Sequence, residues 1–398
     1  MKSKKFESIA LFLFVVSIFA SGINYLFQII SGRLLNQVEY GTLNSVFSII
    51  NILTIFGVAV GLSITKDFAN SGNVKGKIDY LLKLFACLSV PFIAIVAFAM
   101  RIMNFQISVC IISAIAIFLI SSTYIYYGMF QGTKMFFHLS IFNLIQPVIK
   151  LSLGIGLILL GLKINAAPIA MIFGALICII YGHIISCKKF EKSSADFSDI
   201  KPILSYMVFT LISTVCVTVF NNIDILIVRS YFSEYDVGIY SCSALFGKVL
   251  MYIPTALTVL LVPVAAQNNS EGKIALRKSL IYSFLLSSIA GSGLYILRKP
   301  IITIIMGNSY LPAEKYIFPI CITIIPLVLA TVLINYLIAV GDKIFVSISS
   351  LSALAIMLIS VMFIHSSIIT ILLVLAFVYI LLTLILFIRS KNVCPKKI

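Results

Sequence analysis

Residues 366–388, SSIITILLVLAFVYILLTLILFI, form an apolar stretch of 23 residues without a charged side chain. A helix needs about 20 mostly apolar residues to cross the hydrocarbon core of a bilayer. Eleven other stretches of similar length are also mostly apolar, so the sequence predicts an all-α integral membrane protein with about twelve transmembrane helices. The predicted spans are 8–30, 42–65, 80–100, 107–129, 137–162, 164–187, 203–228, 237–266, 279–297, 316–341, 344–364 and 366–388.

The composition argues against soluble and nucleic-acid-binding classes. The chain is 61% hydrophobic and 11% charged, whereas a soluble domain carries about 25% charged residues. The net charge of +16 comes from short basic clusters between the apolar runs, not from one basic face of the kind that binds nucleic acid. The eight cysteines include no CxxC pair, so we expect no metal site, disulfide framework or cofactor.

The distribution of lysine and arginine predicts the orientation. Alternate connecting segments hold 20 of these residues on the side of the N-terminus and 7 on the opposite side. Basic residues are enriched in cytoplasmic loops. Both termini are therefore predicted to be cytoplasmic, in a multi-pass protein.

The two halves of the chain resemble each other. Residues 33–41 (RLLNQVEYG) follow the first span and 229–238 (RSYFSEYDVG) follow the seventh, with their final glycines 197 positions apart. Residues 132–136 (GTKMF) and 341–345 (GDKIF) precede the fifth and eleventh spans, 209 positions apart. The extra 12 positions match the length by which the predicted loop 298–315 exceeds the loop 101–106. We therefore expect two six-helix lobes, 1–201 and 202–398, arranged as a parallel repeat. Such repeats occur in transporters with a midplane substrate site.

Charged residues inside a membrane helix are costly and usually mark a cavity or bundle interior. Lys150 lies 13 residues into the fifth span and Lys248 lies 11 residues into the eighth, which places both near the midplane at about 1.5 Å per residue. Asn143 and Gln146 share one helix face with Lys150. The two lysines belong to opposite lobes and favour a cavity that binds anions.

Further polar residues are candidates with an alternative interpretation. Asn24 and Gln28 continue a stripe with Ser17 and Ser21 on the first span; this stripe lines a cavity or holds helices together by hydrogen bonds. Asp224 lies near the outer end of the seventh span and either acts in gating or pairs structurally, for example with Arg229. Arg33 and Arg229 contribute positive potential at the outer mouth or anchor the helices at the interface.

The motifs resemble the polysaccharide transporter branch of the MOP superfamily, in particular Wzx-type flippases of O-antigen and capsule clusters. The resemblance rests on 33–41, on 127–136 (YGMFQGTKMF) with Asn143 and Lys150, on Asn221 to Asp224 with 238–240 (GIY), and on 300–313 (PIITIIMGNSYLPA).

This resemblance implies a MATE-like fold and a substrate made of an undecaprenyl-diphosphate-linked oligosaccharide repeat unit. The protein would move this substrate by alternating access across a bacterial inner membrane. Lys150 and Lys248 would contact the diphosphate, and Asn143, Gln146, Asn24 and Gln28 would contact sugar hydroxyls or water. A polysaccharide polymerase and chain-length machinery are possible partners.

Two other function classes remain as alternatives. A MATE-type exporter of drugs or small solutes would share the fold, but its drug-exporting members carry membrane carboxylates in the first lobe, and spans one to six contain none. A polymerase or glycosyltransferase would need a catalytic loop outside the bilayer. The chain has no hydrolase, metalloprotease or nucleotide-binding motif, so we expect a protein that is not an enzyme.

Overall fold

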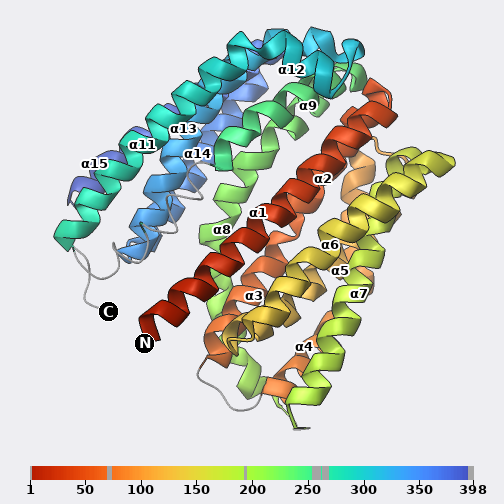
Figure 1. The fold of residues 1–398 in the computed structure, drawn as a ribbon, viewed down its shortest axis with the longest axis vertical. Helices are drawn as coiled ribbons and strands as arrows, with labels where there is room; N and C mark the ends of the chain where they lie inside the picture. The colour runs from red at the N-terminus through yellow and green to blue at the C-terminus, as the bar shows by residue number, and fades with distance from the viewer. Residues whose placement is uncertain (1, 70–73, 192–194, 253–260, 262–268, 393–398) are drawn as a thin grey trace. The chain divides into compact units, whose positions relative to one another are not determined.

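The computed structural model describes residues 2–69, 74–191, 195–252, 261 and 269–392, and all regular structure within these ranges is helical (Figure 1). The chain divides into two compact units, Met1–Val215 and Cys216–Ile398, called lobe 1 and lobe 2 below. Helix α8 (Phe197–Tyr231) contributes to both. The boundary predicted at 201–202 falls within α8 and stays a prediction.

The described residues of lobe 1 form seven α-helices and the first part of α8. The α6–α7 connection consists of two short helical turns, Ile158–Leu162 and Lys163–Asn165. The helices are α1 (Lys2–Leu34), α2 (Gln37–Leu53), α3 (Ile55–Phe68), α4 (Val74–Ile102), α5 (Ile107–Gly132), α6 (Phe136–Leu157) and α7 (Ala166–Lys189).

The described part of lobe 2 contains the rest of α8 and six further α-helices. Helix α9 continues into a short 3-10 turn, Lys248–Met251, and a second such turn, Asn308–Ala313, precedes α13. The helices are α9 (Glu234–Gly247), α11 (Asn269–Ile296), α12 (Arg298–Ile305), α13 (Glu314–Ala339), α14 (Lys343–Phe363) and α15 (Ile368–Asn392).

Nine helical stretches in the described residues are long and apolar enough to cross a membrane. One of them, Phe136–Lys189, has 54 residues and includes the turn at Gly161, so it covers two of the predicted spans. The multi-pass character is thereby confirmed. The count of twelve and the side of each terminus stay predictions.

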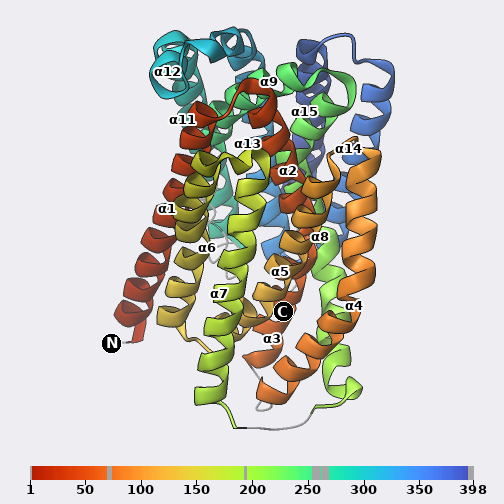
Figure 2. The ribbon, with the colours of Figure 1, turned by 90° about the vertical axis from the view of Figure 1, so that its right-hand side faces the viewer.

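Close contact between α3 and α5 organises lobe 1, where α5 lies among α3, α4 and α7 (Figure 2). Each of the two helices carries glycines four residues apart: Gly57 and Gly61 on α3, Gly128 and Gly132 on α5. A Cβ at Gly57 would lie 2.6 Å from the Cα of Ser121, and one at Gly128 would lie 2.5 Å from the carbonyl oxygen of Gly61. Small residues let backbones approach in a membrane, where association of helices depends on close packing.

The same turn joins the first two helices of each lobe. Helix α2 begins after Asn36, whose side chain accepts a hydrogen bond from the Glu39 N–H at 2.8 Å. Helix α9 begins after Ser233, whose hydroxyl accepts one from the Asp236 N–H at 3.2 Å. These cap residues satisfy N–H groups that the first turn leaves without partners. Asn36 and Ser233 are 197 positions apart, as are the ends of α1 and α8, which supports the predicted duplication.

Three predicted elements differ from the structure. The span 42–65 is interrupted between α2 and α3 at Thr54, whose hydroxyl donates to the Ile50 carbonyl at 2.8 Å; such bonding back to the preceding turn bends helices. The predicted loop 298–315 contains α12. Pro300 does not prevent this helix, because it falls in the first turn, where a missing N–H is tolerated. The span 237–266 changes to a 3-10 turn at Lys248, and 253–260 and 262–266 lie outside the described residues.

Ion pairs join segments predicted on the same membrane face. Lys163 lies 2.8 Å from Glu39, and both belong to segments assigned to the outer face. Arg389 lies 2.7 Å from Asp342, and both belong to segments assigned to the cytoplasmic face. These contacts support the predicted alternation of the connecting segments between two faces.

Candidate functional site

Lobe 1 contains a cavity of about 480 Å³ lined by α1, α3, α5 and α6. Its volume is within the range of roughly 300–1,000 Å³ that is typical of ligand sites. Three of the predicted residues line it: Asn24 on α1, and Asn143 and Gln146 on α6. Helix α1 packs along α6 (Figure 1), which brings the two predicted polar stripes together.

The lining combines amide, hydroxyl and aromatic groups and includes no charged side chain among the described residues. The side-chain amides of Asn143 and Gln146 make no hydrogen bond to any described residue, so they remain available to a ligand. Asn24 donates from Nδ2 to the Ala20 carbonyl at 3.1 Å and keeps its oxygen as an acceptor. This cavity therefore offers neutral hydrogen-bonding groups.

Helix α5 supplies lining residues that the sequence analysis missed. Thr123, Tyr127 and Gln131 follow one another at intervals of four, with Tyr124 beside them, so they occupy one side of the helix. Gln131 is held by the Thr65 hydroxyl, which donates to its Oε1 at 3.2 Å. A polar stripe at helical spacing in an otherwise apolar span was the signal that could have identified them.

Lys150 lies one turn beyond the cavity on α6, and Gln28 lies one turn beyond Asn24 on α1. Neither residue lines the cavity. The ammonium of Lys150 is 5.2 Å from the ring centroids of both Phe27 and Phe47. No carboxylate of the described residues lies within 4 Å of it. The Oε1 of Gln28 is buried and has no hydrogen-bond partner among the described residues. The Lys150 ammonium therefore contacts aromatic rings rather than a carboxylate within this part of the chain, so an anionic ligand would have no ion pair to displace there.

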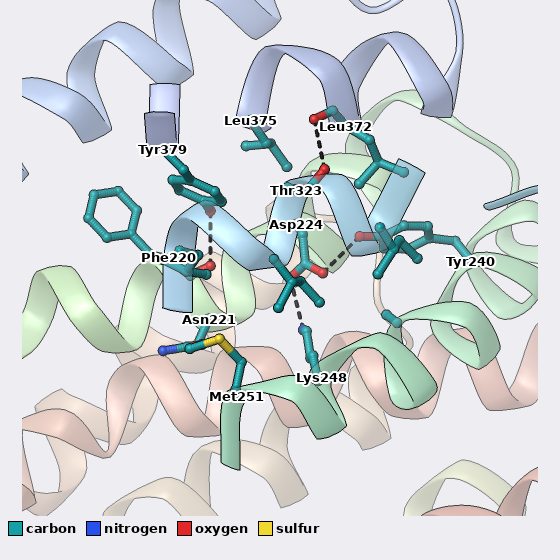
Figure 3. A pocket seen from close by; sticks show the side chains of 14 residues that line it. Phe220, Asn221, Asp224, Tyr240, Lys248, Met251, Thr323, Leu372, Leu375 and Tyr379 are labelled. Atoms are coloured by element: carbon teal, nitrogen blue, oxygen red, sulfur yellow. Dashed lines mark hydrogen bonds and ion pairs between the residues drawn. The ribbon is translucent and has the colours of Figure 1, made fainter. Parts of the chain in front are cut away.

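Lys248 has a different environment in lobe 2, because it is already paired (Figure 3). Its Nζ donates to Oδ1 of Asp224 at 2.9 Å, and the Tyr240 hydroxyl donates to Oδ2 at 2.8 Å. Asp224 and Tyr240 are 8% and 1% exposed. The cavity beside them measures about 20 Å³, which holds about one water molecule. This cluster is close to neutral and has little room for a ligand.

The two lobes differ at matching positions. At the repeat offset of 197, Asp224 corresponds to Phe27 and Asn221 corresponds to Asn24. Phe27 lies beside Lys150 and Asp224 lies beside Lys248. The two lysines are not at matching positions, since Lys248 corresponds to Asn51 at this offset. The anion-binding character predicted for both lysines accordingly has its clearest structural basis at Lys150.

The predicted outer-mouth arginines lie at the ends of the first helix of each lobe. Arg229 lies near the end of α8 and its Nη2 donates to Oε1 of Glu234 at 3.2 Å. Arg33 is exposed near the end of α1. Both positions flank the turns that the cap residues Asn36 and Ser233 shape. Their part in gating stays a prediction.

The fold is similar to that of solved membrane transporters. The lipid II flippase MurJ in an inward closed conformation shares 13% identity and a TM-score of 0.76, over 96% of this chain and 87% of that one. An inward-facing MATE family multidrug resistance transporter of the MOP superfamily shares 10% identity and a TM-score of 0.74, over 95% and 97%. A MATE transporter of Vibrio cholerae shares 12% identity and a TM-score of 0.67, over 97% of both chains.

These similarities confirm the predicted all-α, MATE-like membrane fold. No curated protein matches the chain by sequence. The family model described as "Polysaccharide biosynthesis protein" matches residues 9–269, which include both the lobe 1 cavity and the Asp224–Lys248 pair. The chain therefore belongs to the polysaccharide biosynthesis protein family.

Proposed function

We propose that the protein is a flippase that moves an undecaprenyl-diphosphate-linked oligosaccharide repeat unit across the bacterial inner membrane for O-antigen or capsule biosynthesis. The family supports a role in polysaccharide biosynthesis. The fold is similar to that of MurJ, which is a lipid II flippase. Movement by alternating access requires no catalytic group, so the proposal is a carrier rather than an enzyme. A polysaccharide polymerase and chain-length machinery are proposed partners downstream.

One observation carries the proposal: a cation without a carboxylate partner among the described residues lies one helical turn from an uncharged polar cavity. A lipid-linked oligosaccharide has a diphosphate next to a neutral, hydroxyl-rich chain. Hydrogen bonds from a cation to phosphate are about twice as strong as neutral ones. Lys150 suits the diphosphate, and Asn24, Asn143 and Gln146 suit the sugar. Gln28, whose buried Oε1 has no hydrogen-bond partner among the described residues, is proposed to bind a hydroxyl or water.

Lys248 is proposed as a second contact for the diphosphate, which would compete there with Asp224. Its ammonium is paired with Asp224 at 2.9 Å, so an anion binds there only by drawing Lys248 away from that carboxylate. Breaking a buried pair exposes an uncompensated charge and is costly. We therefore propose that Lys150 is the primary receptor for the diphosphate and that the Asp224–Lys248 pair responds to the transport cycle.

The test compares Lys150→Ala, Lys150→Arg and Ser152→Ala in cells that depend on this protein for surface polysaccharide. Ser152 is exposed on the same helix and serves as the matched control. A charge-assisted hydrogen bond contributes about 1.5–3 kcal/mol, so Lys150→Ala should reduce flipping about 10- to 100-fold. Lipid-linked repeat units should accumulate in the inner leaflet. Lys150→Arg should retain most activity, and Ser152→Ala should behave as wild type. Normal polysaccharide in Lys150→Ala at normal protein level would overturn the assignment.

A MATE-type exporter is the second candidate, because solved MATE structures share the fold and Asp224 provides one buried carboxylate. The same strains distinguish a flippase from an exporter. Overexpression that raises resistance to cationic dyes, together with unchanged polysaccharide after deletion, would favour the exporter.

A further inference from the structure

We propose that the lobe 1 cavity is a subsite for one uncharged pyranose, namely the sugar that carries the diphosphate. This inference rests on the proposed function and deepens it, because it names the part of the substrate that the cavity recognises. Four features of the cavity support this subsite: its size, its tyrosines, its unpartnered amides and its position one helical turn from Lys150.

The tyrosines form the aromatic part of the site. Tyr124 and Tyr127 both line the cavity, and their ring centroids lie 5.9 Å apart with the ring planes tilted by 59°. The tilt shows that the two rings are not stacked on each other, which leaves ring surface for a ligand. The face of an aromatic ring carries partial negative charge, which complements the C–H face of a pyranose. An acyclic polyol with the same hydroxyls has no rigid face of this kind.

The amides supply the hydrogen bonds that a sugar needs. A primary amide offers two donors and one acceptor oxygen, and each sugar hydroxyl both donates and accepts. Asn143 and Gln146 have no hydrogen-bond partner among the described residues. The hydroxyls of Tyr124 and Tyr127 likewise have none within that part of the chain. Amides and hydroxyls facing a cavity of about 480 Å³ match a neutral, hydroxyl-rich ligand.

The position of Lys150 orients the sugar. Lys150 follows Gln146 by four residues on α6, which corresponds to about 6 Å along the helix. This distance suits one pyranose ring with its phosphate-bearing oxygen. A sugar in the cavity therefore places its anomeric phosphate near Lys150, whereas a more distal sugar of the repeat unit does not.

The experiment uses tryptophan fluorescence, since the natural chain has no tryptophan. Tyr127→Trp places a single reporter in the cavity, and Tyr124→Trp is a second reporter if the first does not fold. Phe173→Trp, on a side chain of α7 that is 49% exposed, is the matched control outside the cavity. The purified full chain in detergent is titrated with glucose, galactose, N-acetylglucosamine and N-acetylgalactosamine, and with sorbitol and galactitol as acyclic partners.

We expect a saturable emission change with at least one sugar, with a Kd in the millimolar range, and no such change with its polyol. The corresponding sugar 1-phosphate should bind about tenfold tighter, and Lys150→Ala should remove that gain without removing sugar binding. Asn143→Leu and Gln146→Leu should each weaken sugar binding about tenfold.

The inference is overturned if no sugar gives a saturable change in either reporter, or if the polyols or Phe173→Trp respond equally. It is also overturned if the 1-phosphate gains nothing over the free sugar. These measurements use no lipid. A failed flipping assay with intact sugar binding would therefore count against the proposed function alone, and the reverse result would count against this subsite alone.

Discussion

The Asp224–Lys248 pair shows that a neighbouring carboxylate determines whether the charge of a buried lysine is already compensated. Both carboxylate oxygens of Asp224 accept hydrogen bonds, one from Lys248 and one from Tyr240 (Figure 3). Lys150 has aromatic rings in place of such a carboxylate. The two lysines are similar in depth by sequence, yet their charges are compensated differently.

We predict that Asp224→Asn lowers the free energy of unfolding by about 1–3 kcal/mol, because it leaves the Lys248 ammonium without an anionic partner. The double variant Asp224→Asn with Lys248→Met removes both charges and should recover most of this loss. Lys299→Gln is the control, since Lys299 and its partner Glu314 are 63% and 30% exposed and such pairs contribute little. Thermal unfolding followed by circular dichroism measures all three. A double variant no more stable than Asp224→Asn would show that the pair is not the cause.

Sequence reasoning identified the polar residues of α1 and α6 but not their environments. Asn24, Asn143 and Gln146 were recognisable because a polar stripe in an apolar span is costly. The separation of Lys150 and Gln28 from the cavity, and the pairing of Lys248, depend on which side chains of other helices approach them. Tyr124 and Tyr127 were missed, because aromatic residues are ordinary components of an apolar helix.

At the scale of elements, hydropathy located the spans because each must cover the same bilayer thickness. It did not locate the interruptions. Thr54 ends α2 through a hydrogen bond to the preceding turn. Lys248 begins a 3-10 turn beside Asp224. Both depend on local hydrogen bonding, to which a hydropathy window is insensitive. Short α12 was missed because eight residues are too few for a span.

The close contact between α3 and α5 predicts that an added methyl group at its glycines is destabilising. Gly128→Ala should reduce the amount of folded protein strongly, because the new Cβ would lie 2.5 Å from the Gly61 carbonyl oxygen. Overpacking of this kind costs about 1–3 kcal/mol or more. Gly156→Ala on α6 is the matched control, since no atom lies within 4 Å of its added Cβ. Monodisperse yield in detergent and the melting temperature are the measurements. Equal behaviour of the two variants would mean that α3 and α5 tolerate a wider separation.

Across the whole chain, the internal repeat of the sequence is also found in the positions of helix ends and caps. The offset of 197 recurs in the ends of α1 and α8 and in the caps Asn36 and Ser233. A helix turn needs specific cap residues, so duplicated turns stay recognisable in sequence after the helices themselves have diverged. The matching positions Phe27 and Asp224 show that the two lobes differ beside their buried lysines.

The predicted orientation is testable through the connecting segments. In a variant whose eight cysteines are replaced, a single cysteine at Lys163 should react with a membrane-impermeant thiol reagent in intact cells. A single cysteine at Lys134 should react only after the cells are permeabilised. The reason is the excess of lysine and arginine in the segments that include Lys134, since such segments stay cytoplasmic. Both side chains are exposed, so accessibility depends on the membrane face and not on burial. Labelling of Lys134→Cys in intact cells would reverse the assigned orientation, and labelling of both would break the predicted alternation of spans.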